Sequence, residues 1–290
     1  MHKLGVLGVG YVGSAVSECF ELLLQDKVEI REYDKFKPTE SLETVVNHSN
    51  VLFVCVPTPM REDGSCDATI VESVVEELNA TASKPKAVVI KSTVPPGITQ
   101  RLQDKYPKHS FVFNPEFLTE KRFIEDFLEQ DRIILGCTSN KQQLFRVDKL
   151  FQDFIGAQKK SALIVKVPSE QAEMLKYATN CFLATKLSFF NEIYQICQAA
   201  NVDYGSVVSM LKLDKRVGGS HMGVPGPDGQ LGWAKSCFPK DINALISFAK
   251  DSGVDPLMLE SAWTKNLLVR DRHDWQELPQ VSGNYKKKPE

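Results

Sequence analysis

The sequence contains no apolar stretch long enough to span a membrane and no marked excess of charge of either sign. Its 35 Lys and Arg stand against 37 Asp and Glu, a formal net charge of -2. We therefore expect neither a nucleic-acid partner nor a membrane partner. The seven cysteines show no metal-ligand spacing, and their odd number favours reduced thiols over a disulfide framework. These absences predict a cytoplasmic protein without a bound metal, and 290 residues suffice for two domains.

Glycine is concentrated near the N-terminus in the stretch Gly8-Val9-Gly10-Tyr11-Val12-Gly13, between a short apolar strand and an apolar-periodic segment. Here the first glycine permits a tight turn, the second lets the backbone approach a pyrophosphate, and the third lets the helix pack on the strand. Asp34 ends the next predicted strand, where a carboxylate binds a ribose 2′-hydroxyl and repels a 2′-phosphate. This pattern predicts NAD as cofactor, while Arg31 and Lys35 leave NADP as an alternative.

Short apolar strands alternate with helical patterns through the first part of the chain. They are predicted at residues 4–7, 28–30, 51–56, 87–91, 111–113, 132–135 and 162–165. Residues 169–201 then lack both glycine and proline and predict one long helix, with another helical segment at about 204–213. We expect an α/β fold: a Rossmann-type, mostly parallel sheet in residues 1–167, followed by an all-α domain with a long central helix in residues 168–290. Residues 217–235, rich in glycine, predict a loop that is either a linker or a lid.

Cys237 is placed where its thiol could act as a nucleophile. Pro239 suits a first helical position, so we expect a helix to begin just after the cysteine. The positive end of the helix dipole and Lys240 would both lower the pKa of the thiol. Asp241, four residues on, should share the helix face that points back toward the sulfur. The alternative is a thiol that is simply buried.

Polar side chains follow several predicted strands. Thr58 and Thr93 come after two of them, and loops at the carboxyl ends of parallel strands line the ligand crevice of an open sheet. Each threonine is therefore a candidate cofactor contact, with ordinary turn chemistry as the alternative. Glu116 and Glu120 stand four apart after a third strand, where surface solvation is the alternative.

Together these segments resemble the UDP-glucose/GDP-mannose dehydrogenase family. The resemblance covers essentially the whole chain and is carried, in family order, by Gly8-Val9-Gly10-Tyr11-Val12-Gly13, Val56-Pro57-Thr58-Pro59, Lys91-Ser92-Thr93-Val94-Pro95, Asn114-Pro115-Glu116-Phe117-Leu118, Asp131-Arg132, Lys176 through Asn180, and Cys237-Phe238-Pro239-Lys240-Asp241. It implies an NAD-dependent oxidation of a sugar-nucleotide primary alcohol, similar to UDP-glucose, to a uronate. Two hydride transfers would pass through a thiohemiacetal and a thioester on Cys237.

The resemblance also implies roles for individual residues. Lys176 would stabilise oxyanion charge, Asn180 would orient substrate or water, and Asp241 would assist proton transfers. Glu116 and Thr93 would position the hydrolytic water. Glu120 would lie near the nicotinamide, and substrate contacts would come from Glu116, Phe117, Leu118, Lys176, Asn180 and Arg216. In the family the arginine matched by Arg216 reaches into the neighbouring subunit, so we expect a homodimer formed through the long helix.

Three departures from the family pattern leave other functions open. The sequence stops where family members usually continue with a third, nucleotide-recognising domain, so we expect a short member. The usual pair of glycines before the cysteine is replaced by Ala234 and Lys235, which removes glycine's freedom for left-handed backbone angles and adds a cation beside the thiol. Lys121 stands where many relatives have a small residue. One alternative is a one-step β-hydroxyacid-type dehydrogenase, and another is a non-catalytic binding subunit of a full-length relative.

Overall fold

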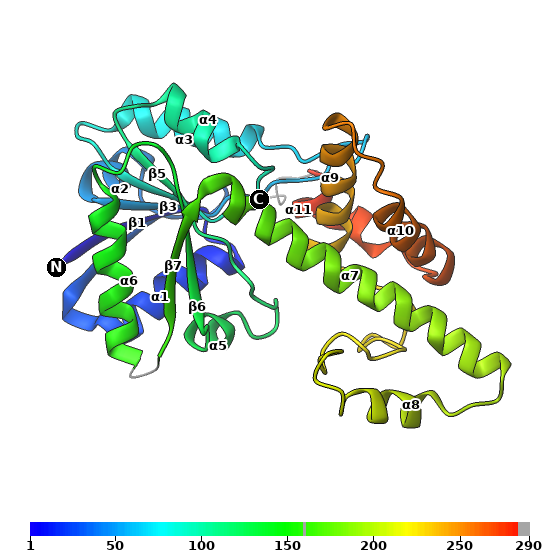
Figure 1. The fold of residues 1–290 in the computed structure, drawn as a ribbon. Helices are drawn as coiled ribbons and strands as arrows, with labels where there is room; N and C mark the ends of the chain where they lie inside the picture. The colour runs from blue at the N-terminus through cyan, green and yellow to red at the C-terminus, as the bar shows by residue number, and fades with distance from the viewer. Residues whose placement is uncertain (159–160, 284–290) are drawn as a thin grey trace. The chain divides into compact units, whose positions relative to one another are not determined.

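The computed structural model describes residues 1–158 and 161–283, which form two compact units (Figure 1). Unit 1 comprises Met1–Thr58 and Asp67–Lys176. Unit 2 comprises Pro59–Cys66 and, among the described residues, 177–283. The boundary between the units falls inside the long helix α7 (Ser169–Ala199). Each unit has hydrophobic clusters of its own.

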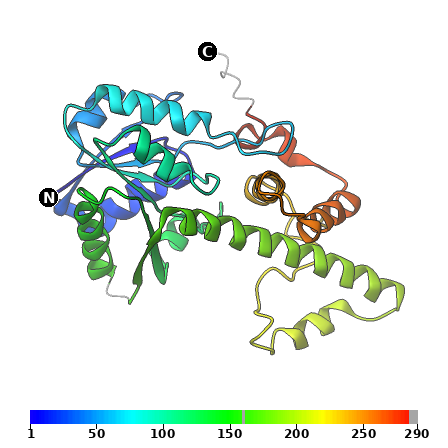
Figure 2. The ribbon, with the colours of Figure 1, turned by 45° about the horizontal axis from the view of Figure 1, so that its top comes forward.

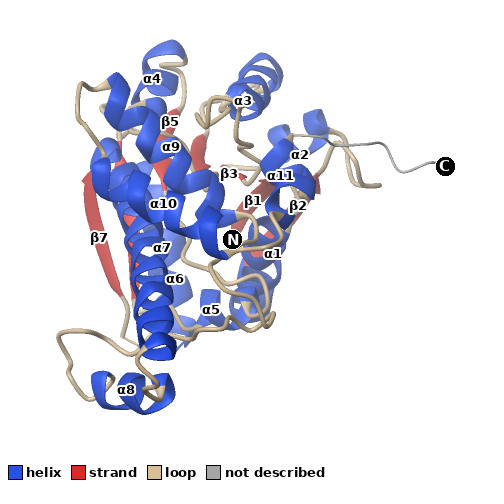
Figure 3. Ribbon diagram, turned by 90° about the vertical axis from the view of Figure 1, so that its right-hand side faces the viewer, coloured by secondary structure: helices blue, strands red, loops and turns tan. Residues whose placement is uncertain are grey.

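Unit 1 is built on a seven-stranded sheet, whose strands are drawn in red in Figure 3. The strand order is β2-β1-β3-β4-β5-β6-β7. The strands are β1 (His2–Leu7), β2 (Val28–Tyr33), β3 (Val51–Val54), β4 (Ala87–Ile90), β5 (Ser110–Phe113), β6 (Arg132–Cys137) and β7 (Leu163–Pro168). All neighbouring pairs are parallel except β5 with β6. The seven predicted strands and the mostly parallel sheet are confirmed.

Helices cover both faces of this sheet and bury its apolar side chains. One face packs against α1 (Tyr11–Leu24), α5 (Phe123–Leu128) and α6 (Leu144–Gln158). The other packs against α2 (Leu42–His48), α3 (Thr69–Thr81) and α4 (Ile98–Lys105). On α1, Ala15, Val16, Cys19 and Phe20 are all buried, the spacing that places side chains on one face of a helix. Burial of both faces explains why β3 and β4 are continuously apolar and why β5 is apolar after Ser110.

The strand order creates a switch point next to β1. The chain places β2 on one side of β1 and β3 on the other. In open α/β sheets, ligands bind outside the carboxyl ends of the strands at such a point. The glycine motif follows β1 and the turn containing Thr58 follows β3, so both lie at this end of the sheet.

The long helix α7 begins directly after β7 and runs unbroken from Ser169 to Ala199 (Figure 2). This confirms the predicted central helix. The other α-helices that the structure describes in unit 2 are α8 (Tyr204–Leu211), α9 (Cys237–Asp251), α10 (Leu257–Val269) and α11 (Pro279–Ser282). One cluster joins Cys181 of α7 to Ile242 of α9 and Ala262 of α10. Residues 217–235 contain no helix or strand, as predicted for a loop.

The start of α9 differs from the sequence expectation. The helix begins at Cys237 itself, so Pro239 is the third helical residue rather than the first. Proline is tolerated here because the first N–H groups of a helix have no intrahelical acceptor. The cysteine therefore belongs to the first turn of α9 instead of preceding it.

Across residues 1–158 and 161–283, none of the helices has the combination of length and apolar character that crossing a membrane requires.

Candidate active site

The glycine motif joins β1 to α1 through backbone that a larger residue would block. Gly8 has a φ of +95°, and a Cβ on Gly13 would lie 2.0 Å from the Gly8 carbonyl oxygen. A Cβ on Gly10 would meet no heavy atom within 4 Å, so the N-terminus of α1 faces open space. Helix N-terminal N–H groups bind phosphate oxygens, and this open backbone therefore fits the pyrophosphate of a dinucleotide.

Asp34, just beyond β2, reaches the glycine motif with its carboxylate. Its Oδ2 accepts a hydrogen bond from the Val9 N–H at 2.8 Å, and its Oδ1 accepts one from the Phe36 N–H at 2.9 Å. These bonds hold the acid where an adenosine ribose would lie, which fits NAD. Arg31, which left NADP open, instead pairs with Glu40 at 3.0 Å.

The turns that carry Thr58 and Thr93 are tied together. Ser92 Oγ donates to the Val56 carbonyl at 2.7 Å, linking the turn after β4 to the turn after β3. Both threonines are buried. Because β3 and β4 are parallel neighbours, the threonines follow the same end of the sheet. Their predicted contact with the cofactor remains a prediction.

A buried lysine holds the turn after β5. Lys91 Nζ donates to Asn114 Oδ1 at 2.8 Å, and Asn114 Nδ2 donates to the Ile134 carbonyl at 2.8 Å. Burial lowers the pKa of Lys91 to about 8, although the nearby Glu116 carboxylate acts in the opposite direction. The chain of bonds crosses from β4 to β6 and fixes the residue that precedes Pro115.

Glu116 and Lys176 form a buried ion pair in unit 1. Lys176 Nζ lies 2.9 Å from Glu116 Oε1 and 2.5 Å from the Glu116 carbonyl oxygen. The two side chains are 10% and 3% exposed. Glu116 Oε2 also accepts the Leu118 N–H at 2.7 Å, and Lys176 Nζ lies 5.4 Å from the centre of the Phe117 ring. We call these four residues the Glu116 cluster.

The charge of Glu116 is set by its neighbours. Burial alone would raise its pKa, but Lys176, the Leu118 N–H and Lys91 together hold the pKa below its ordinary value. Glu116 is therefore a carboxylate at neutral pH. Beside it, the Lys176 ammonium can stabilise negative charge that develops on an oxygen.

A second polar cluster surrounds Asp241 in unit 2. Asn180 Nδ2 donates to Asp241 Oδ2 at 2.6 Å, and Lys240 Nζ lies 2.5 Å from Asp241 Oδ1. Asp241 is 1% exposed and lies one helical turn after Cys237 on α9. Cys181 Sγ donates to the Asp241 backbone carbonyl at 3.6 Å. We call Asn180, Cys237, Lys240 and Asp241 the Asp241 cluster.

Lys240 carries the positive charge of this cluster. Burial alone would lower its pKa, but Asp241, followed by the thiols of Cys237 and Cys66, holds the pKa above its ordinary value. A permanent cation among these groups favours the thiolate form of a neighbouring cysteine. The predicted lowering of the Cys237 pKa remains a prediction.

The loop that leads into Cys237 is anchored at its end. Asn266 Oδ1 accepts the Trp233 N–H at 2.7 Å, and Asn266 Nδ2 donates to the Trp233 carbonyl at 2.9 Å. Asn191 Oδ1 accepts the Gly232 N–H at 2.7 Å. Gly232 has a φ of +72°, and a Cβ there would lie 2.5 Å from Asn266 Oδ1. This clamp holds the segment that leads into Cys237 against α7 and α10.

Arg216 is held differently from the residues of the two clusters. Its guanidinium pairs with Asp214 at 2.6 Å, and its side chain is 90% exposed. Its predicted role toward a neighbouring subunit remains a prediction. Glu120 lies in the turn before α5, and its predicted place near the nicotinamide is likewise untested.

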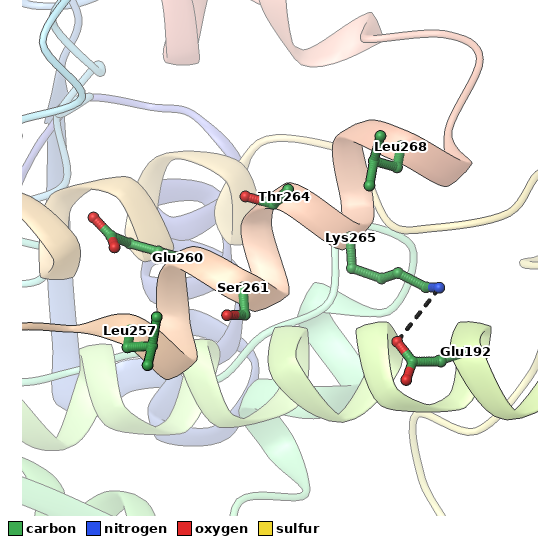
Figure 4. Close-up of a pocket in the computed structure, with 7 residues that line it drawn as sticks. All are labelled: Glu192, Leu257, Glu260, Ser261, Thr264, Lys265 and Leu268. Carbon is green, nitrogen blue, oxygen red and sulfur yellow. Dashed lines mark ion pairs between the residues drawn. The ribbon is translucent and has the colours of Figure 1, made fainter.

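A pocket on unit 2 shares no residue with either cluster (Figure 4). An ion pair between Lys265 and Glu192 at 3.4 Å crosses it. It is lined by Glu192, Leu257, Glu260, Ser261, Thr264, Lys265 and Leu268. These residues include no predicted site residue, so the pocket does not define the candidate active site.

The sequence matches two domains of one protein family. The NAD binding domain of the UDP-glucose/GDP-mannose dehydrogenase family matches residues 16–155, and the central domain of that family matches residues 170–267. The chain belongs to the UDP-glucose/GDP-mannose dehydrogenase family. Membership confirms the predictions of a dehydrogenase and of NAD as its cofactor. The first match begins after the glycine motif, so the motif is supported by its own geometry.

Several relatives within the family are similar over most of this chain. UDP-glucose 6-dehydrogenase TuaD of Bacillus subtilis is 31% identical, covering 99% of this chain and 67% of the relative. UDP-glucose 6-dehydrogenase AglM of Haloferax volcanii is 30% identical over 90% of this chain and 68% of the relative. The solved UDP-glucose dehydrogenase of Pyrobaculum islandicum aligns with a TM-score of 0.79 at 30% identity, covering 92% and 68%. The chain thus spans about two thirds of the length of these relatives.

Three buried polar side chains of this dehydrogenase were missed in the sequence. Lys91 directly follows β4, whereas Glu173 and Asn266 lie within helices. Charged and amide side chains usually face solvent, and nothing in the local pattern separates these three from exposed ones. Their importance comes from partners distant in the sequence.

Lys235 adopts the backbone conformation that the replaced glycines would have made easy. Its φ is +68°, directly before Ser236 and Cys237. The loss of glycine therefore does not prevent the left-handed backbone angle. A residue with a side chain nevertheless pays roughly 1–2 kcal/mol of conformational strain at such an angle. Its side chain is exposed.

We expect Lys235→Gly to stabilise the protein by about 0.5–1 kcal/mol, because removal of the strain exceeds the entropy that glycine adds to the unfolded chain. Urea unfolding measures the difference. Lys215→Gly is the matched control: Lys215 is also an exposed loop lysine, but its φ is not positive, so glycine there should not stabilise. Equal effects of the two variants would contradict strain at Lys235.

We expect Asp34→Asn to weaken NADH binding about tenfold or more, because it removes a charged hydrogen-bond acceptor for the ribose. NADPH binding should change less or improve, because the repulsion of the 2′-phosphate is also removed. Fluorescence titration with both nucleotides measures the selectivity. Asp26→Asn makes the same substitution at an exposed position and should leave selectivity unchanged; an equal shift in both variants would contradict a specific role for Asp34.

Proposed function

We propose that this dehydrogenase oxidises the primary alcohol of a nucleotide sugar, similar to UDP-glucose, to the uronate through covalent intermediates on Cys237. The observation that carries the proposal is the Asp241 cluster. Cys237 opens α9, and both carboxylate oxygens of Asp241 are held by Asn180 and Lys240 one turn further on. Such a cluster offers a nucleophile at a helix N-terminus together with a fixed group for proton transfer.

The proposed steps balance as follows. Bound NAD supplies the hydride acceptor for each of two oxidations. The Cys237 thiolate adds to the carbonyl carbon of the aldehyde and forms a thiohemiacetal. After the second oxidation, water attacks the resulting thioester, the carbon–sulfur bond breaks, and the carboxylate leaves as Cys237 recovers its thiol. In these steps Asp241 shuttles protons while Asn180 orients the reacting oxygen.

The Glu116 cluster supplies the complementary groups of the proposal. The Lys176 ammonium is charged, nearly buried and already directed at oxygen atoms, so it suits stabilisation of an alkoxide or tetrahedral oxyanion. Glu116, held as a carboxylate, can position and activate the hydrolytic water together with Thr93. Glu120, Phe117, Leu118 and Arg216 keep the cofactor and substrate contacts that the family resemblance implies.

UDP-glucose is the first substrate to test because TuaD and AglM are both named UDP-glucose 6-dehydrogenases. We assign residues 1–167 to cofactor binding and residues 168–290 to the domain with the nucleophile. The stoichiometry of the reaction separates the proposal from its alternatives. Formation of two NADH and one acid per sugar would support the proposal. Formation of one NADH and a carbonyl product would indicate a one-step dehydrogenase. If the purified chain turns over none of a panel of nucleotide sugars, the result would indicate a binding subunit.

We expect Cys237→Ser to reduce formation of the acid by roughly three orders of magnitude or more, because an alkoxide forms far less readily than a thiolate at neutral pH. At most one NADH should form per sugar. The matched control is Cys197→Ala, which removes a buried thiol of α7 outside the Asp241 cluster. Coupled NADH absorbance and product chromatography measure both effects; acid formation at the wild-type rate in the serine variant would refute the covalent step.

We further propose a homodimer formed through α7. Phe182, Phe189 and Ile196 are 65%, 57% and 55% exposed and are spaced seven residues apart, which places them along one side of the helix. A row of exposed apolar side chains of this size is typical of a protein–protein interface. All seven cysteines lie in the described part of the chain and none forms a disulfide, which supports the proposed cytoplasmic location.

We expect Phe189→Glu to convert the dimer to a monomer, because two charges would be buried against apolar side chains in a symmetric interface. Light scattering after size exclusion measures the mass. Leu213→Glu, at a position that is 82% exposed beyond α8, adds the same charge outside the row and should leave the mass unchanged. A wild-type monomer, or a variant that stays dimeric, would contradict the interface.

A further inference from the structure

Glu173 is a fully buried acid whose carboxylate accepts hydrogen bonds from one short segment of the chain, Gly97 to Thr99. It lies in the second turn of α7 and is 0% exposed. Its Oε2 accepts the Gly97 N–H at 2.6 Å. Its Oε1 accepts the Thr99 N–H at 2.9 Å and the Thr99 hydroxyl at 2.6 Å.

These donors open helix α4, and Glu173 acts as the cap that the helix does not supply for itself. Gly97 is the N-cap residue of α4, with a φ of +96° and no side chain to accept a bond. A carboxylate at a helix N-terminus is favoured by the helix dipole and satisfies N–H groups that have no intrahelical partner. The capped turn is the one that carries Thr93. Glu173 therefore connects α7 to the turn after β4.

The same part of α7 carries Lys176. Lys176 follows Glu173 by three residues, close to one helical turn, and bonds to Glu116 in the turn after β5. Directly before Glu173, α7 packs on β6, since a Cβ on Gly136 would lie 2.7 Å from the Ala172 Cβ. A shift of α7 along its axis would therefore displace the lysine from Glu116.

We propose that Glu173 is a positioning residue: by capping α4 it fixes the register of α7, and so holds the Lys176 ammonium against Glu116 beside the turn of Thr93. The catalytic consequence rests on the function proposed above, whereas the positioning itself does not.

The burial of Glu173 explains why its donors matter. Burial raises its pKa to about 7, and the hydrogen bonds from Thr99 and Gly97 oppose this rise. A glutamine here has only one side-chain oxygen, so it can accept from some of the three donors. Its NH₂ group would then face at least one N–H group of Gly97 or Thr99. Glu173→Gln thus removes the cap with almost no change in volume.

The first measurement needs no catalytic activity. Acetylation of the folded chain by an N-hydroxysuccinimide ester, followed by peptide mass spectrometry, gives the rate at Lys176 relative to Lys250, which is 57% exposed. We expect Glu173→Gln to raise this ratio at least about threefold. Thr99→Ser keeps the hydroxyl donor and should preserve the wild-type ratio, whereas Thr99→Val should give an intermediate value.

Gln103→Met is the matched control for general destabilisation. Gln103 is also buried in unit 1, and its side chain bonds to Phe111, His109 and Thr138 rather than to α7. Its variant should lower the melting temperature without exposing Lys176. An unchanged ratio in Glu173→Gln, or an equal rise in Gln103→Met, would overturn the proposal.

The second measurement is steady-state kinetics with a nucleotide sugar that the wild type oxidises. Glu173→Gln should lower kcat about tenfold or more while KM for NAD stays within about twofold, because the glycine motif is untouched. Wild-type kcat in this variant would overturn the catalytic consequence. If the wild type oxidises none of the sugars, the proposed function fails, and the labelling at Lys176 still decides whether Glu173 positions it.

Discussion

The buried ion pair between Lys176 and Glu116 is the constraint on which the rest of the candidate site depends. Two charges removed from water are tolerated only when their remaining hydrogen-bonding capacity is also used, and removal of one partner typically costs about 3–5 kcal/mol. Here the Glu116 carbonyl accepts a further bond from Lys176, and the Leu118 N–H donates to the Glu116 carboxylate. The pair therefore fixes the turn after β5 against α7.

The Asp241 cluster is another buried charged group whose hydrogen-bonding capacity is used, and Asn180 on the next turn of α7 contributes to it. Asn180 lies four residues after Lys176 and neutralises none of the charge, but it satisfies one carboxylate oxygen while Lys240 satisfies the other. Within unit 1, a shift of α7 along its axis would separate Lys176 from Glu116. Glu173 touches neither cluster, and its proposed effect on Lys176 is carried by the helix alone.

The sequence allowed prediction of features that depend on local pattern. Seven strands, the long helix and the loop at 217–235 follow from apolar runs and from the presence or absence of glycine and proline. The start of α9 was wrong by two residues, because proline is acceptable at several positions of a first turn. Glu173 and Asn266 could not be found, since their partners lie more than 30 residues away in the sequence and each is an ordinary polar residue within a helix.

The seven cysteines show how position rather than residue type distinguishes a candidate nucleophile from a thiol that only fills the core. Burial raises the pKa of Cys19 and Cys55 to about 12 and raises that of Cys181 further, so these thiols stay protonated at neutral pH. Cys237 instead occupies the first turn of a helix and shares its surroundings with a charged lysine. The helix start at Cys237 places this cysteine in the first turn of α9, where the helix dipole favours a thiolate.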